Sequence, residues 1–380
     1  MKNLNLIIKP TNACNLRCKH CYHAEKGYDE QLLPIEYIEK AISVFSQEYS
    51  EISILWHGGE PMLVGAKYFS RVLNRIAQSA QSNNCKISYR MQTNATLIDD
   101  TWVEIIKNNN IKLGVSFDGP FNDDLRQGTE RVLESIEMLQ NNNIKFGLLS
   151  VVTSKNISKL NELVDWFNSK KLSFKFNPIF ESGEAKCNND YIISPDDYIH
   201  NFCLAFVSWL HNIECEISIS SFEKYIILDS RTCTNTSCMY KWLSMDSSGN
   251  FFPCGRPYPI EFTLGNISQI SSSTDLFDSD QYKMLLSQAT IRRKSCIETC
   301  KWAGFCQGGC NASALIENKL SSTDFWECVT EKAILEFTQP YAQKFYSDVA
   351  IGNYSEYNPM IVKYYLNKKK NKPNRTPSKD

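Results

Sequence analysis

Short β-branched runs alternate with longer helical patterns from residue 4 to about residue 178, and this alternation constrains the fold most. The runs expected to be strands are LNLIIK (4–9), EISILWH (51–57), KISYRMQ (86–92), IKLGVSF (111–117), IKFGLLSVV (144–152) and LSFKFNP (172–178). The segments between them place apolar residues at spacings of three and four, as amphipathic helices do. Six such units with right-handed crossovers predict an α/β chain that begins with a partial (β/α)6 barrel.

Unusual motifs follow four of these predicted strands. They are CNLRCKHC (14–21) after the first, GGEP (58–61) after the second, TNA (93–95) after the third and SFDGP (116–120) at the end of the fourth. In barrels of this type the reactive groups lie on the loops that follow the strands. We therefore expect these motifs to meet at one rim.

Cysteine content indicates metal or redox chemistry. The chain has 15 cysteines in 380 residues, no apparent export signal and no run of about 18 apolar residues. We expect a cytoplasmic protein without a membrane partner, in which thiols stay reduced. The net charge of −1 argues against a nucleic-acid partner.

The first motif holds Cys14, Cys18 and Cys21, one thiol short of the usual four protein ligands. Three thiolates on an iron-sulfur cluster would leave one iron open for a small molecule. Zinc is the alternative, with His20 or His23 as fourth ligand. Structural zinc sites usually come as two spaced pairs, which disfavours zinc.

The CxxxCxxC spacing and the three motifs that follow it resemble the radical S-adenosylmethionine (radical SAM) enzymes. The resemblance implies that Cys14, Cys18 and Cys21 hold a 4Fe-4S cluster whose open iron binds the methionine end of S-adenosylmethionine. His20 lies at a position that is often aromatic in the family. The implied cofactor-binding residues are Gly58, Gly59, Glu60, Gln92, Asn94, Ser116 and Asp118. An arginine should also approach the cofactor, and Arg126 and Arg131 are both candidates.

Eight later cysteines resemble the SPASM domain, a C-terminal extension of radical enzymes that act on peptides and proteins. The resemblance implies two auxiliary 4Fe-4S clusters, three clusters in all. One would be held by Cys233, Cys238, Cys254 and Cys310, and the other by Cys296, Cys300, Cys306 and Cys328. Three residues separate Cys296 from Cys300, where the family more often has two.

Four cysteines remain after this assignment: Cys85, Cys187, Cys203 and Cys215. We expect them to be packing residues, although Cys187 follows the sixth strand and should lie on the active rim. A helix is predicted to begin at Ser194-Pro195.

We expect the chain to divide into a barrel (1–212), a bridging segment (213–232), a SPASM domain (233–330) and a C-terminal helix with a basic disordered tail (331–380). The tail is basic because residues 363–380 carry seven Lys or Arg and one acidic residue.

The resemblance implies a maturase that uses a 5′-deoxyadenosyl radical on a ribosomally made precursor peptide. Anaerobic sulfatase maturases are expected to carry Asp directly after the cysteine matching Cys254, where this chain has Gly255-Arg256. Sulfatase maturation is therefore disfavoured. Cross-linking, thioether formation and epimerisation remain, and among these we favour carbon-carbon cross-linking. A cysteine-rich zinc scaffold is the non-enzyme alternative. The sequence does not identify a catalytic acid or base.

The expected partners are the precursor peptide and an electron donor of the flavodoxin or ferredoxin type. The chain starts almost directly at the first strand, so we expect the leader peptide to be recognised either by a separate protein or by the barrel and SPASM surfaces themselves.

Overall fold

The computed structural model describes residues 2–23, 31–227 and 238–370. The six predicted strands are confirmed, and their ends differ from the prediction by at most two residues. They are β1 (Asn3–Ile8), β2 (Glu51–Trp56), β3 (Lys86–Thr93), β4 (Lys112–Ser116), β5 (Phe146–Val152) and β6 (Phe174–Pro178). All neighbours among them pair in parallel, as expected for a βα barrel.

A second set of strands extends this sheet beyond β1. Strand β7 (Trp242–Met245) pairs in parallel with β1, and β8 (Asn250–Phe252) and β9 (Gly265–Asn266) follow as antiparallel strands. The sheet order is β6-β5-β4-β3-β2-β1-β7-β8-β9. The cysteine-rich C-terminal region therefore begins inside the barrel's own sheet.

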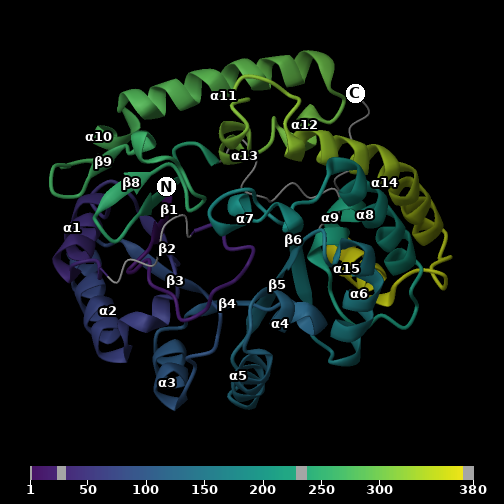
Figure 1. The fold of residues 1–380 in the computed structure, drawn as a ribbon, viewed down its shortest axis with the longest axis horizontal. Helices are drawn as coiled ribbons and strands as arrows, with labels where there is room; N and C mark the ends of the chain where they lie inside the picture. The colour runs from purple at the N-terminus through teal and green to yellow at the C-terminus, as the bar shows by residue number, and fades with distance from the viewer. Residues whose placement is uncertain (1, 24–30, 228–237, 371–380) are drawn as a thin grey trace.

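Helices cover the outer face of the curved sheet (Figure 1). Those of the βα units are α1 (Ile35–Phe45), α2 (Ala66–Gln81), α3 (Asp100–Asn108), α4 (Asn122–Leu125), α5 (Thr129–Asn141) and α6 (Leu160–Ser169). After β6 come α7 (Glu184–Cys187), α8 (Pro195–Leu210) and α9 (Ser220–Ile227). The remaining helices are α10 (Ser273–Phe277), α11 (Asp280–Thr299), α12 (Ala303–Cys306), α13 (Asn311–Ile316), α14 (Trp326–Ala350) and α15 (Pro359–Lys370).

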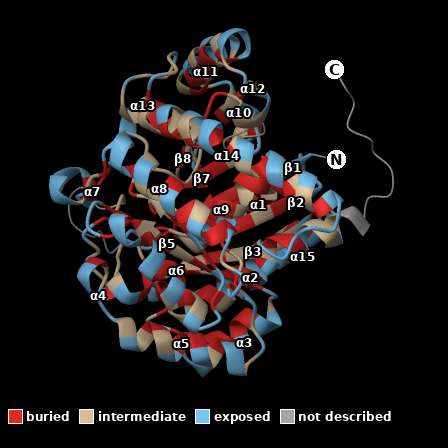
Figure 2. Cartoon of the chain, turned by 90° about the vertical axis from the view of Figure 1, so that its right-hand side faces the viewer, coloured by how far each residue is buried: buried red, intermediate tan, exposed pale blue. Residues whose placement is uncertain are grey.

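The two faces of the strands differ in burial, which fixes the side on which the core lies. In β2 the side chains of Ile52, Ile54 and Trp56 are fully buried toward the helices, while the alternate residues are half-buried. Figure 2 shows the buried residues concentrated along the strands and the helix faces that touch them. The inner face is thus the one left for a site.

The C-terminal helices pack onto the barrel. Helix α14 contacts α8 and α9, and α15 buries Ile361 and Val362. Residues 363–370 continue α15, in contrast to the disorder expected from residue 363 onward, because Tyr365 and Leu366 pack against the core. Residues 371–380 of the predicted tail lie outside the described residues. Within the described part of the chain, no helix is long and apolar enough to cross a membrane.

We predict that Ser194→Ala destabilises the protein by about 0.5–2 kcal/mol, the usual cost of losing a helix cap. The predicted start of α8 is confirmed, and the Ser194 hydroxyl accepts a hydrogen bond from the Asp197 amide at 3.0 Å. Ser194→Gly is the matched control and should cost only a few tenths of a kcal/mol. Urea unfolding of the anaerobic protein measures both, and an equal loss for the two variants would contradict the capping role.

Candidate functional site

The loop after β1 carries the cysteine triplet and packs directly against the loop after β2. The amide of Gly59 donates to the carbonyl of Thr11 at 3.1 Å, and that of Glu60 donates to Ala13 at 2.8 Å. A Cβ on Gly59 would lie 2.0 Å from the Ala13 oxygen, and one on Gly58 would lie 2.5 Å from the Thr11 oxygen. Glycine is therefore required at both positions by the close approach of the two loops.

Glu60 joins the second motif to the third. Its carboxylate is 1% exposed and accepts hydrogen bonds from the amides of Met62 and Asn94 and from the Thr93 hydroxyl. Burial raises the pKa of this carboxyl to about 7, although the three donors oppose that shift. A carboxylate has about four acceptor positions, so one remains for a further donor.

The other polar residues expected from the motifs also meet here. The Asn94 side-chain amide lies 3.9 Å from the Cys14 sulfur and donates to Asn15 at 2.9 Å. The Gln92 side-chain amide donates to the Ser116 hydroxyl at 2.8 Å. The Gln92 side chain crosses β4 at Gly114, and a Cβ at that glycine would lie 2.3 Å from the Gln92 side-chain oxygen. The structure thus brings together the four motifs at the carboxyl ends of β1 to β4.

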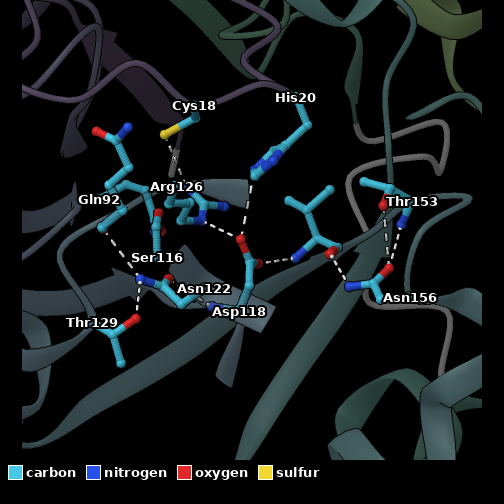
Figure 3. A network of polar contacts seen from close by, with 12 residues as sticks. Cys18, His20, Gln92, Ser116, Asp118, Asn122, Arg126, Thr129, Thr153 and Asn156 are labelled. Atoms are coloured by element: carbon cyan, nitrogen blue, oxygen red, sulfur yellow. Dashed lines mark hydrogen bonds and ion pairs between the residues drawn. The ribbon is translucent and has the colours of Figure 1, made fainter. Parts of the chain in front are cut away.

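A buried ion pair occupies the centre of this region (Figure 3). The Asp118 carboxylate is fully buried, accepts from Arg126 Nε at 2.6 Å and accepts from the Val151 amide at 2.6 Å. His20 Nε2 lies 3.8 Å from the same carboxylate, too far for a hydrogen bond. Burial, and then the Arg126 charge, lower the pKa of His20 to about 3, so this imidazole is neutral.

The structure distinguishes the two candidate arginines. Arg126 Nη1 lies 4.0 Å from the Cys18 sulfur. Arg131 instead donates to the carbonyls of Thr96 and Ile98 and pairs with Glu134. Arg126 is therefore the arginine at the cysteine loop, a choice that the sequence left open because both residues follow the same strand.

Sequence reasoning missed an aromatic and imidazole group beside the triplet. The Tyr22 hydroxyl lies 3.4 Å from His57 Nε2, and the His23 and His57 rings are 5.1 Å apart. Phe180, from the loop after β6, meets Tyr22 edge-on at 6.2 Å. The only sequence signal was position, because Tyr22, His23 and His57 adjoin the first two motifs.

Three of the first four SPASM-like cysteines lie near one partly buried tyrosine, Tyr258. Tyr258 lies with its hydroxyl 4.0 Å from the Cys254 sulfur. Its pKa is raised well above the usual value by burial and then by Cys254, Cys310 and Cys238. Cys233 lies outside the described residues.

The second set of cysteines also forms a neighbourhood. Burial and then Cys296 and Cys300 raise the pKa of the Cys328 thiol to about 11. Cys306 has its pKa raised to about 12 by burial and by Glu331 and Glu327, with smaller contributions from Cys328 and Cys296. Cys296, Cys300, Cys306 and Cys328 thus lie near one another, and the division of the later cysteines into two ligand sets stays a prediction.

The four remaining cysteines differ in exposure. Cys85, Cys203 and Cys215 are buried, whereas Cys187 is exposed at the end of α7. Helix α7 itself touches the triplet loop, since its Ala185 amide donates to the Cys21 carbonyl at 3.3 Å. Cys187 is therefore near the rim in sequence and in space.

The donor set at the triplet suits an iron-sulfur cluster. Among the described residues, no three His, Cys, Asp or Glu side chains converge closely enough to hold a single metal ion. Burial raises the pKa of Cys14 to about 11 and also raises that of Cys18, so these thiols need nearby positive charge to ionise. The Leu16 amide, 3.4 Å from the Cys14 sulfur, and the Arg126 guanidinium are N–H donors of the kind that stabilise cluster sulfurs.

Comparison with known families agrees with this chemistry. Residues 8–167 match the model of the radical SAM superfamily. The chain is 26% identical over 369 residues to a cysteine-type anaerobic sulfatase-maturating enzyme of Clostridium perfringens (strain 13 / Type A), covering 90% of this chain and 97% of that one. It is 25% identical over 351 residues to a serine-type anaerobic sulfatase-maturating enzyme of Bacteroides thetaiotaomicron, covering 81% and 83% of the two chains.

A solved structure shows the same fold with ligands bound. It is "Native anSMEcpe with bound AdoMet and Cp18Cys peptide", where AdoMet is S-adenosylmethionine. The likeness has a TM-score of 0.76 and 25% identity, and covers 91% of this chain and 99% of that one.

We predict that Asp118→Asn destabilises the protein by about 3–5 kcal/mol, because it leaves the Arg126 charge buried without its partner. Arg126→Met should have a similar effect by orphaning the carboxylate. The double variant should lose much less than the sum of the two, and urea unfolding of all four proteins measures this coupling. If the losses of unfolding free energy in the two single variants added up to the loss in the double variant, the interaction between Asp118 and Arg126 would contribute nothing to stability.

Proposed function

Because this chain belongs to the radical SAM superfamily, with a SPASM-type C-terminal region, we propose that it cross-links carbon atoms of two side chains in a ribosomally made precursor peptide. The chain is a radical SAM enzyme, and its relatives are maturases. A peptide substrate is supported by the solved relative that binds S-adenosylmethionine and a peptide together. The choice of bond is supported by residues of this chain alone.

We assign the catalytic 4Fe-4S cluster to Cys14, Cys18 and Cys21. Glu60 has one acceptor position left for the ammonium group of S-adenosylmethionine, and Asn94 and Ser116 lie beside the same loop. The bound cofactor and cluster would supply a 5′-deoxyadenosyl radical able to take hydrogen from an unactivated carbon. Gly58, Gly59, Gln92 and Asp118 shape and support this pocket.

The two further groups of cysteines are assigned to auxiliary 4Fe-4S clusters. Cys238, Cys254 and Cys310, with Cys233, would hold one, and Cys296, Cys300, Cys306 and Cys328 the other. Eight thiolates ligate two clusters completely, which suits electron transfer rather than direct binding of substrate. A donor of the flavodoxin or ferredoxin type would reduce the catalytic cluster.

The observation that carries the choice of reaction is the residue after Cys254. A sulfatase maturase is expected to have an aspartate at this position, and this chain has Gly255. A Cβ added at Gly255 would lie 2.5 Å from the end of the Ile7 side chain, so the site as folded has no room for a larger residue. The next residue is Arg256, which donates to Ser313 at 3.1 Å and lies 4.3 Å from the Phe180 ring centroid. A guanidinium cannot act as a base at neutral pH, so this position lacks the expected carboxylate.

Sulfatase maturation is the second candidate, and overall similarity favours it. The two curated relatives described above are cysteine-type and serine-type sulfatase-maturating enzymes aligned over most of their length. Such an enzyme would oxidise one Ser or Cys side chain to an aldehyde. The two candidates therefore differ in whether the product joins two residues.

We predict that the peptide product is lighter by two hydrogens per cross-link, with one S-adenosylmethionine consumed each time. One hydrogen leaves in 5′-deoxyadenosine, and the second leaves as a proton and an electron when the new bond closes. Tandem mass spectrometry of the precursor peptide, encoded by a short reading frame beside this gene, measures the mass and shows which two residues no longer fragment separately.

The same mass loss is expected for oxidation of a serine, so a hydrazide reagent is the control. A product that reacts with hydrazide and fragments normally would establish an aldehyde and contradict cross-linking. A product of unchanged mass that gains deuterium at one α-carbon in heavy water would identify an epimerase instead, for which Cys187 is the candidate hydrogen donor by position.

We predict that Cys18→Ala abolishes formation of 5′-deoxyadenosine, because the triplet is the assigned site with an open iron. Cys328→Ala should retain some cleavage of S-adenosylmethionine while losing the modified peptide. Cys203→Ala, at a buried cysteine outside all three groups, is the matched control and should retain both. Chromatography of 5′-deoxyadenosine measures cleavage, and substantial cleavage by Cys18→Ala would refute the assignment of the catalytic cluster.

A further inference from the structure

Arg292 is a cation buried in the middle of the cysteine-rich region. It belongs to α11, four residues before Cys296, and its side chain is fully buried. A guanidinium stays protonated in proteins, so the positive charge is buried together with the side chain. Burial of a charge is costly unless the charge is paired and hydrogen-bonded.

The groups that bind Arg292 are neutral. Its Nε donates to the Gly308 carbonyl at 2.8 Å, and its terminal nitrogens donate to the Leu320 carbonyl and to the side-chain oxygen of Asn311. Within the part of the chain that the structure describes, no carboxylate forms an ion pair with Arg292. These hydrogen bonds therefore satisfy N–H groups of the guanidinium but do not neutralise its charge.

The turn between Cys306 and Cys310 is one of the segments that Arg292 holds. Residues 307–309 of this turn all have positive φ, and two of the three are glycines. Left-handed backbone of this kind persists where the surroundings fix it, and here the Gly308 carbonyl is fixed by Arg292. Arg292 therefore holds a turn that has an assigned cluster ligand at each end.

Two more segments with assigned ligands meet Arg292. The guanidinium lies 5.4 Å from the ring centroid of Phe325, which precedes Cys328 by three residues. Cys296 follows Arg292 by four residues on α11, so both side chains lie on the same side of the helix. Burial and then Cys300 raise the pKa of the Cys296 thiol, and the Arg292 charge opposes that rise.

The next residue of α11 adds a second cation with an unused donor. Arg293 Nε donates to the Gln307 carbonyl at 3.3 Å. The Arg293 Nη2 atom is buried and has no hydrogen-bond partner among the described residues. A buried N–H group is costly to leave unpaired, so this donor indicates an acceptor bound at the neighbouring cysteines.

An iron-sulfur cluster fits both requirements. What we call the second auxiliary cluster is the one assigned to Cys296, Cys300, Cys306 and Cys328. Its four thiolates outweigh the positive charge of a 4Fe-4S core, so the site is an anion, and reduction by one electron makes it more negative. A nearby cation stabilises the reduced form more than the oxidised form, and this effect is strong where water does not screen it.

We propose that Arg292 is a positioning residue for the second auxiliary cluster, and that its buried charge raises the reduction potential of this cluster. The inference rests on the proposed function for the assignment of the cluster, whose four ligands are all described residues. It does not depend on which bond the enzyme forms in the peptide. The reduction potential can therefore be measured without the substrate.

The experiment is an anaerobic titration of the holoenzyme with dithionite, followed by electron paramagnetic resonance. The signal of the second auxiliary cluster is the one that changes in Cys328→Ser, and the signal of the catalytic cluster is the one that changes when S-adenosylmethionine is added. In Arg292→Met the second auxiliary cluster should be at least tenfold less reduced at a given potential. For a one-electron couple this is a fall of about 59 mV in the midpoint potential.

Further variants separate the charge from the hydrogen bonds. Arg292→Lys keeps the charge but has a single ammonium in place of the planar fork, so it should restore most of the midpoint potential while holding the turn less firmly. Lys294→Met, at an exposed lysine of the same helix, is the matched control. It removes an equal charge that solvent screens, so its midpoint potential should equal that of the wild type.

An unchanged midpoint in Arg292→Met, or an equal fall in Arg292→Met and Arg292→Lys, would overturn the inference. Iron and sulfide analysis shows which variants hold the cluster, and Arg292→Gln decides if Arg292→Met does not hold it. If neither neutral variant holds the cluster, Arg292→Lys should still hold it, and its loss there as well would overturn the role of the charge.

The same analysis of the wild type distinguishes this inference from the proposed function. Iron for fewer than three clusters would refute the assignment of the clusters, and the inference with it. A full complement of iron with an unchanged midpoint in Arg292→Met would refute the inference alone. The mass of the peptide product remains an independent test of cross-linking.

Discussion

Parallel pairing of β1 with β2 on one side and β7 on the other is the constraint on which the site depends. Because the carboxyl ends of parallel strands meet at one edge, this pairing sets the cysteine triplet, the GGEP loop and the segment that leads to Cys254 side by side. Strand β7 fixes the segment that leads to Cys254, and α14, which carries Cys328, is held separately by its contacts with α8 and α9. Backbone hydrogen bonds of one sheet therefore join the loop of the cysteine triplet to the segment that leads to Cys254.

Buried polar groups then hold the loops in place. Glu60 ties the second motif to the third, and Asp118 ties the fourth to β5 and to Arg126. Each carboxylate is almost or fully buried, so its hydrogen bonds are costly to leave unmade. Residues expected to bind a cofactor thus also maintain the shape of the pocket, and substitutions there will affect both.

Overall similarity to the sulfatase maturases and the residues that follow Cys254 favour different reactions for this chain. Similarity to the curated sulfatase maturases extends over most of the chain, the radical SAM model matches residues 8–167, and the solved relative shares the fold. The proposed reaction differs because this chain has Gly255 and Arg256 directly after Cys254, where a sulfatase maturase is expected to carry a carboxylate. An arginine in place of a carboxylate is compatible with shared radical formation and a different fate for the peptide radical.

The sequence alone predicted the strand positions and the parallel βα architecture, because hydrophobic period is a local signal. Its cysteine spacing gave the resemblance to radical SAM enzymes that the family model supports, whereas the grouping of the later cysteines stays a prediction. It did not determine which arginine reaches Cys18, since Arg126 and Arg131 follow the same strand and only the path of the chain separates them. Nor did it indicate that Tyr22 and His57 meet beside the triplet, because these residues are 35 positions apart in the sequence. Only the close packing of the loops after β1 and β2 brings the two side chains together.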